Sequence, residues 1–210
     1  MFLNPIITAD AQAVPIMDAA SRLRVGKHQC SVGALSKVLA AALGLDEAHC
    51  RLIGKAAVLH DVGKLYVSAL VNDKCGPHDL NEILAMHQHP IFGHAHLCAF
   101  KQTPMLKLAA VIALQHHEKF DGTGYPFGLS GDTIAPESRI VSICDVYDAL
   151  REDRLYRTKI GHNAAMQVIT CGDDRTKPSM FDPAVLNAMA KNHEQIRAVF
   201  DSHHPDVEAT

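Results

Sequence analysis

Seven histidines and aspartates, spread along a chain of otherwise helical pattern, constrain the fold of this protein most strongly. The local pattern places most of them at or near helix ends: His28, His60, Asp61, His89, His116, His117 and Asp145. Imidazole nitrogens and carboxylate oxygens are the ligands of sites with two transition-metal ions, which activate water and cleave phosphate esters. We therefore expect these residues to build such a site.

The pattern of apolar and capping residues predicts an all-helical fold. Apolar residues at helical spacing, with prolines near helix starts and glycines after helix ends, indicate helices at 11–43, 46–61, 79–87, 90–100, 103–117, 136–150, 162–170 and 183–200. The segment 62–77 is predicted to be a loop. The segment 121–136 holds four glycines and two prolines, so we expect an irregular loop there. No strand pattern and no internal repeat is present.

Composition narrows the class of protein further. Hydrophobic residues make up 48% of the chain and aromatics only 5%, which suits a helical core of small aliphatic side chains. The net charge of -3 argues against bulk binding to a nucleic acid polymer or to an anionic membrane. The N-terminus is not typical of a signal peptide, no apolar stretch is long enough to span a membrane, and the six cysteines form no CxxC pair. These features predict a cytoplasmic protein with reduced thiols.

Four of the candidate residues carry specific chemical arguments. Asp61 has two carboxylate oxygens, so it can bridge two metal ions. Asp145 lies within an otherwise apolar helix, where a carboxylate is costly unless it is paired or bound to a metal. His116 and His117 would point about 100° apart on a helix, so both reach one ion only at the helix end. Any one of these features occurs often by chance, and their co-occurrence in order carries the interpretation.

Longer motifs surround these residues. They are His60-Asp61-Val62-Gly63-Lys64, His116-His117-Glu118, Asp121-Gly122-Thr123-Gly124-Tyr125-Pro126, and the run from Arg139 to Leu150 followed by Arg154-Leu155-Tyr156-Arg157. In these motifs the chain resembles the HD-GYP domain, a subgroup of the HD phosphohydrolase superfamily. The resemblance implies a bundle of about seven or more helices around a dinuclear metal centre. It also implies an N-terminal extension (1–20), an HD-GYP domain (21–200) and a loose C-terminal tail (201–210).

The resemblance further implies a bacterial phosphodiesterase that hydrolyses cyclic di-GMP to linear pGpG or on to GMP. It assigns one metal to His28, His60, Asp61 and Asp145. It assigns the second metal to His89, His116 and His117, with Asp61 as the bridge. Hydrolysis of another cyclic nucleotide, such as cyclic GMP-AMP, is one alternative. A non-catalytic cyclic dinucleotide receptor is another, and the complete ligand set disfavours it.

The resemblance also suggests residues that touch substrate or partner. Lys64 would bind a phosphate oxygen or help to protonate the leaving group. Arg154 and Arg157 would contact phosphate as bidentate donors, with a solvated helix end as the alternative. The loop of Gly124, Tyr125 and Pro126 would either shape the rim of the pocket or dock a partner such as a diguanylate cyclase (GGDEF) domain.

One departure from the family pattern bears on the number of metals. Some members have a glutamate one helical turn before the first ligand histidine, where it helps to hold a third ion, and this chain has Arg24 there. We therefore expect two divalent ions, with Fe or Mn favoured by the resemblance and Ni or Zn compatible with the ligands. Histidines 87, 94 and 96 are predicted to lie behind the ligands or on the surface. Six further histidines match no motif and are predicted to be solvated: His49, His78, His162, His193, His203 and His204.

Overall fold

The computed structural model describes residues 19–74, 76–153 and 158–205, and for residues 19–25 only the backbone. Within these ranges the chain is helical and forms no strand, which confirms the predicted fold class. The α-helices are α1 (Ala19–Ala42), α2 (Glu47–Ala57), α3 (Ala69–Asn72), α4 (Leu80–Met86), α5 (His89–Cys98), α6 (Pro104–Gln115), α7 (Pro136–Arg151), α8 (His162–Cys171), α9 (Pro183–Lys191) and α10 (His193–His203). Short 3-10 helices are η1 (Val62–Tyr66), η2 (Gly131–Thr133) and η3 (Pro178–Met180).

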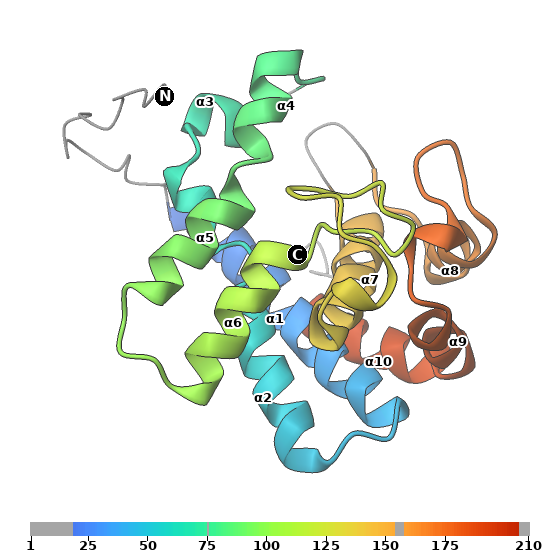
Figure 1. Ribbon diagram of the computed structural model, residues 1–210. Helices are drawn as coiled ribbons and strands as arrows, with labels where there is room; N and C mark the ends of the chain where they lie inside the picture. Colours follow the sequence, from blue (N-terminus) through green and yellow to red (C-terminus); the bar gives the residue numbers. More distant parts are fainter. Residues whose placement is uncertain (1–18, 75, 154–157, 206–210) are drawn as a thin grey trace.

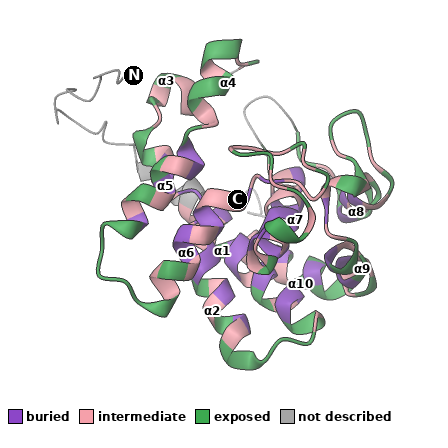
Figure 2. Cartoon of the chain, in the orientation of Figure 1, coloured by how far each residue is buried: buried purple, intermediate pink, exposed green. Residues whose placement is uncertain are grey.

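Helix α1 is the central element of the bundle. It packs against α2, α7, α9 and α10, while α6 lies against α2, α5 and α7 (Figure 1). Its buried side chains Leu35 and Leu39 are one helical turn apart, so they share a face, and they meet Ile53 and Ile143 in the same core. Buried residues concentrate where α1, α6 and α7 face one another (Figure 2). Among the described residues, no helix is both long enough and apolar enough to cross a lipid bilayer.

Several helix boundaries differ from the sequence prediction, and the helix predicted at 46–61 ends already at Ala57. The segment 183–200 forms two helices, because Asn192 leaves the helical conformation and its side-chain amide donates to the carbonyl of Ala188 at 2.8 Å. The predicted loop 62–77 contains η1 and α3. Helix α10 continues to His203, so it crosses the predicted domain boundary at residue 200, and the first residues of the expected loose tail are helical.

The approach of η1 to α5 fixes the first part of the candidate site. Gly63 lies so close to α5 that a Cβ atom at this position would meet the carbonyl oxygen of His89 at 1.9 Å. Only glycine permits this contact. The turn that carries His60 and Asp61 is thereby held directly against the N-terminus of α5, which begins at His89.

Candidate metal centre

Asp61 lies between two groups of imidazoles, and each of its carboxylate oxygens faces one group. Oδ1 is 3.3 Å from Nε2 of His89 and 3.6 Å from Nε2 of His116. Oδ2 is 3.4 Å from Nε2 of His60 and 4.0 Å from Nε2 of His28. A carboxylate with one oxygen directed at each group has the arrangement that a bridging ligand needs.

The seven residues selected from the sequence converge from five parts of the chain. Ligand atoms of Asp61, His89, His116 and His117 lie within 4.8 Å of one another, and so do those of His28, His60 and Asp61. Asp145, on α7, belongs with the second group, because its Oδ1 is 3.2 Å from Nε2 of His28 and 3.9 Å from Nε2 of His60. The two groups share Asp61 alone.

Backbone carbonyls fix which nitrogen three of the histidines turn toward the centre. Nδ1 of His60 donates to the carbonyl of Ala57 at 2.8 Å, and Nδ1 of His89 donates to that of Met86 at 2.7 Å. Nδ1 of His116 likewise donates to the carbonyl oxygens of the last turn of α6. Because a carbonyl can only accept, Nδ1 carries the proton in each ring and the Nε2 lone pair faces the centre.

A buried carboxylate, Asp148, performs the same task for His28. Nδ1 of His28 lies 2.6 Å from Oδ2 of Asp148, and the hydroxyl of Ser31 donates to the other oxygen. Sequence reasoning did not select Asp148. A signal was present, because Asp148 lies three residues after Asp145 and therefore on the same face of an otherwise apolar helix. It orients His28 in the way that carboxylates behind metal-bound histidines do.

The chemistry of the buried atoms fits a divalent metal. Among the described residues, Nε2 of His28, Nε2 of His60 and Oδ1 of Asp61 are buried without a hydrogen-bond partner. Buried polar atoms are rarely left in this state without a ligand. Imidazole nitrogen and carboxylate oxygen are also the donors that Fe, Mn, Ni and Zn accept.

The charges of the cluster favour a cation. Burial would raise the pKa of Asp61, but the Lys64 ammonium and His60 outweigh it and hold the pKa well below its usual value. Burial lowers the pKa of His116 to about 4, so this ring is neutral. His28 differs: burial opposes its charge, but Asp145 and Asp148 together raise its pKa to about 10. A metal ion would have to displace that proton, because ligation requires the neutral ring.

Lys64 and Tyr125, two further candidates from the sequence, border the cluster. Nζ of Lys64 is 2.5 Å from Oδ2 of Asp61, and the lysine side chain is 33% exposed, so it reaches from the solvent edge to the bridging carboxylate. The ring of Tyr125 lies between two histidines, with its centroid 4.7 Å from that of His117 and 3.8 Å from that of His87. The tyrosine therefore covers a candidate metal ligand.

The loop that carries Tyr125 is held by tight backbone contacts. A Cβ atom on Gly124 would meet the backbone nitrogen of Lys119 at 2.4 Å, so only glycine fits. The buried carboxylate of Glu118 accepts hydrogen bonds from the amides of Phe127 at 2.8 Å and Leu129 at 2.9 Å. Glu118 thus fixes the loop next to the ligand pair, while the side chain of Phe127 is 60% exposed at the surface.

Three predicted positions fall outside the described side chains. Arg154 and Arg157 belong to the segment 154–157, which is not among the described residues. Arg24 lies in the first part of α1, residues 19–25, where only the backbone is described. The predictions that rest on these arginines stay predictions.

The prediction that six histidines are solvated is wrong for two of them. His162 is buried, and its ring bonds to Tyr147 and His193. His204 stacks on Phe200 with ring centroids 4.1 Å apart, and its Nε2 lies 3.4 Å from Oδ1 of Asp148. Both errors arise because helices distant in sequence cover these side chains, which no local pattern reveals.

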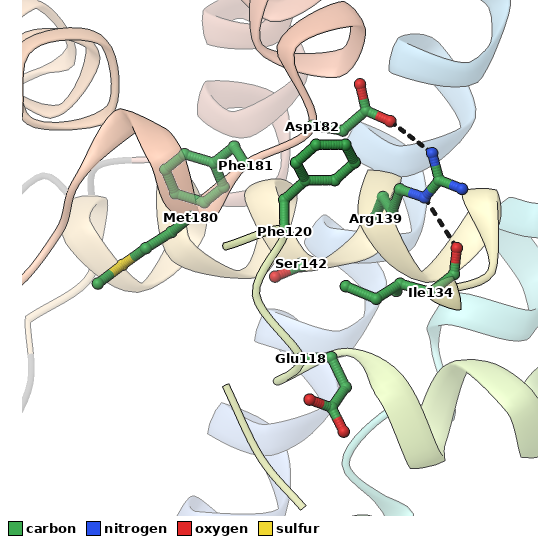
Figure 3. A pocket seen from close by; sticks show the side chains of 8 residues that line it. All are labelled: Glu118, Phe120, Ile134, Arg139, Ser142, Met180, Phe181 and Asp182. Atoms are coloured by element: carbon green, nitrogen blue, oxygen red, sulfur yellow. Dashed lines mark hydrogen bonds and ion pairs between the residues drawn. The ribbon is translucent and has the colours of Figure 1, made fainter. Parts of the chain in front are cut away.

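A small cavity beside the loop is separate from the seven candidate ligands. It is lined by Glu118, Phe120, Ile134, Arg139, Ser142, Met180, Phe181 and Asp182 (Figure 3). Arg139 crosses it, donating to the carbonyl of Ile134 at 2.8 Å and to Asp182 at 2.8 Å. These bonds tie the loop and the start of α9 to α7, so the cavity is a packing gap behind the site.

The sequence of this chain is similar to those of known proteins. A sequence profile described as the HD domain matches residues 14–185. The cyclic di-GMP phosphodiesterase response regulator RpfG of Xanthomonas campestris is 36% identical over 162 residues, which are 77% of this chain and 42% of that protein. The 3'3'-cGAMP-specific phosphodiesterase 3 of Vibrio cholerae is 34% identical over 190 residues, which are 90% of this chain and 39% of that protein.

A solved structure supports the fold. The protein Bd1817 of Bdellovibrio bacteriovorus, an HDG"Y"P protein, superimposes with a TM-score of 0.63 at 22% sequence identity, over 81% of this chain and 52% of that one. The chain spans less than half the length of the two curated relatives. Because the profile match covers most of the chain and the structure has the corresponding helices and His–Asp cluster, the chain belongs to the HD domain family, in its HD-GYP subgroup.

Proposed function

We propose that this chain is a metal-dependent phosphodiesterase that hydrolyses cyclic di-GMP to linear pGpG or on to GMP. The carboxylate of Asp61 carries the proposal, because its two oxygens face two separate groups of imidazoles. That arrangement suits a pair of ions with one bridging ligand, as in phosphoester-cleaving sites. The relatives named for hydrolysis of cyclic dinucleotides support the same chemistry.

Seven residues would hold the metals. His28, His60, Asp61 and Asp145 would bind one ion, and Asp61, His89, His116 and His117 would bind the other. When bound, two such ions lower the pKa of a shared water and stabilise the charge that develops on the phosphoryl oxygens. We propose two ions per chain. The donor set suits Fe, Mn, Ni or Zn, and Fe or Mn is favoured by the family resemblance.

The protein residues perform the remaining tasks. Asp148 and the backbone carbonyls hold the imidazoles in the tautomer that directs Nε2 inward. Lys64, which is partly exposed beside Asp61, would hold a phosphate oxygen or help to protonate the leaving oxygen. Tyr125 stacks on His117 and would form a wall of the substrate pocket. The loop of Gly124, Tyr125 and Pro126 would alternatively dock a GGDEF domain, since the next residue, Phe127, is exposed beside the site.

A second substrate deserves a direct comparison. The Vibrio cholerae relative that covers 90% of this chain is named for cleavage of 3'3'-cGAMP. Both dinucleotides offer the same phosphodiester, so the metal cluster does not discriminate between them. The difference in base must be recognised by residues at the rim of the pocket.

The deciding experiment is turnover by metal-replete protein prepared anaerobically with Fe or Mn. Chromatography of the products should show hydrolysis of cyclic di-GMP, with 3'3'-cGAMP assayed in parallel at the same concentrations. Faster turnover of 3'3'-cGAMP would assign the alternative substrate. Binding of cyclic di-GMP without hydrolysis, in protein that holds two metals, would contradict the proposal and indicate a receptor.

A further inference from the structure

A second group of metal-ligand atoms lies between α8 and α10, apart from the cluster around Asp61. His162, His193 and Glu194 each contribute one nitrogen or oxygen atom, and these atoms lie within 4.8 Å of one another. We propose that this group binds a single Zn²⁺ ion, which fastens the N-terminus of α8 to that of α10.

The spacing of the two imidazoles suits one ion. His162 is the first residue of α8 and His193 the first of α10, and packing brings Nε2 of His162 to 3.1 Å from Nδ1 of His193. Two nitrogens bound to a tetrahedral zinc at about 2.05 Å are about 3.3 Å apart. Oε1 of Glu194 lies 3.6 Å from Nδ1 of His193, so the third donor is within reach of the same point.

The residue behind His162 prepares its Nε2 for a metal. Nδ1 of His162 is 2.8 Å from the hydroxyl of Tyr147, a buried residue of α7. Metal-binding histidines commonly donate their second ring N–H to a polar partner of this kind.

The two arginines near the site are paired with carboxylates. Arg151 is paired with Asp201 at 2.9 Å, so its charge is already compensated. Arg197 approaches Oε2 of Glu194 at 3.8 Å, on the oxygen opposite the one that faces His193. His162 is buried and Glu194 is exposed, so the site opens to solvent on the Glu194 side, where water would complete the coordination.

The site lies apart from the proposed phosphodiesterase centre and shares no ligand with it. Tyr147 follows Asp145 by two residues on α7, so the two side chains point about 200° apart and serve opposite faces of the helix. His193 and Glu194 also lie beyond residue 185, where the match to the HD domain family ends. A zinc ion here would stabilise the docking of α10 and take no part in hydrolysis.

Zinc binding is tested by equilibrium dialysis against buffered free Zn²⁺ with metal counting by mass spectrometry. His193→Ala should bind one Zn²⁺ fewer per chain than the wild type. Glu194→Gln should need at least about tenfold more free Zn²⁺ for the same occupancy. The control is His49→Ala, because Nε2 of His49 pairs with Glu137 at 2.9 Å but belongs to no group of three candidate ligands in the described part of the chain, and its zinc count should not change. Zn²⁺ should also raise the melting temperature of the wild type more than that of His193→Ala.

A second background separates this ion from those of the main centre. Asp61→Ala, which removes the bridging ligand, should still bind one Zn²⁺, and the double variant with His193→Ala should bind none. Circular dichroism checks that each variant is folded, and if Asp61→Ala is not, the wild-type comparison decides. Equal zinc counts in the wild type and His193→Ala would overturn the proposal. If the wild type does not hydrolyse cyclic dinucleotides but His193→Ala still binds one Zn²⁺ fewer, the phosphodiesterase proposal is contradicted and the zinc proposal stands.

Discussion

At Asp61, one buried carboxylate faces two groups of imidazoles that lie in different parts of the sequence. Its two oxygens approach His89 and His116 on one side and His60 and His28 on the other. A histidine on one side serves one ion, whereas Asp61 would serve both. Substitutions at the two kinds of position should therefore differ in how many metals they remove.

The first prediction follows from this difference. Asp61→Ala should lose both metals of the centre and reduce hydrolysis to background, because no other candidate ligand belongs to both groups. His89→Ala should mainly weaken the ion on its own side. Metal analysis after dialysis, together with steady-state kinetics, measures both effects. Asp132→Ala, at a side chain that is 93% exposed, is the control, and retained turnover in Asp61→Ala would exclude the dinuclear mechanism.

The second prediction concerns Lys64, whose ammonium lies at the solvent edge of the cluster. Lys64→Met should keep both metals but weaken substrate binding or turnover about ten- to a hundredfold. A charge-assisted hydrogen bond to phosphate contributes roughly 1.5–3 kcal/mol, and 1.4 kcal/mol corresponds to a factor of about ten. Kinetics of metal-replete protein give kcat and KM separately, and a larger loss in kcat would indicate a role at the leaving oxygen. The exposed Lys37 offers the matched Lys37→Met control, and equal kinetics in both variants would place the phosphates elsewhere.

At the scale of elements, α10 is linked to the metal centre through His204, the residue that follows the helix, and Asp148. His204 follows the last turn of this helix, stacks on Phe200, and places Nε2 3.4 Å from Oδ1 of Asp148. The other oxygen of Asp148 holds Nδ1 of His28. The packing of α10 on α1 is thereby linked to the orientation of a candidate ligand.

The third prediction tests this link. His204→Ala should lower the metal affinity of the His28 side by about tenfold, since losing a partner behind a metal ligand costs about 10- to 100-fold in affinity. His204→Gln should restore part of it, because the amide can still donate to Asp148. Competition with a chelator measures the affinity. His203→Ala is the control at the neighbouring position, and equal affinities in all four proteins would show that His204 only packs.

At the scale of the whole molecule, His28 is protonated in the metal-free protein. Burial alone would make this ring neutral, but two neighbouring carboxylates keep it charged. Asp145 and Asp148 raise the pKa of His28 to about 10, from about 6.5 when unfolded, despite its burial. Because folding raises the pKa of His28, its protonation stabilises the folded state fully at pH values below the pKa of the unfolded chain. That stabilisation is lost as the pH rises through about 10.

The fourth prediction is therefore a loss of stability of the metal-free protein between pH 7 and pH 9. The expected change in the free energy of unfolding is about 2 kcal/mol, since each unit of pKa difference corresponds to about 1.36 kcal/mol. Urea denaturation at the two pH values measures it. His28→Gln is the reference, because its stability changes with pH only through the other titratable groups. Its free energy of unfolding should decrease less between the two pH values, and equal decreases in both proteins would contradict the charged state of His28.

The sequence by itself determined the helical class, the loop at 121–136 and the identity of the clustered residues. Apolar periodicity and capping residues act over one or two helical turns, so most helices could be predicted within a few residues. The His and Asp motifs are local strings whose chemistry is fixed by residue type. Their order along the chain, read together with the family resemblance, was therefore sufficient to name all seven residues of the cluster that the structure brings together.

Only the tertiary structure decided which atoms meet. The two-sided position of Asp61, the support of His28 by Asp148, and the pairing of His162 with His193 depend on how helices pack across long sequence separations. The break at Asn192 was also hidden, because a side-chain bond to a backbone carbonyl competes with an otherwise continuous helical pattern. Such contacts are set by packing angles and burial, which a linear pattern of residue types does not contain.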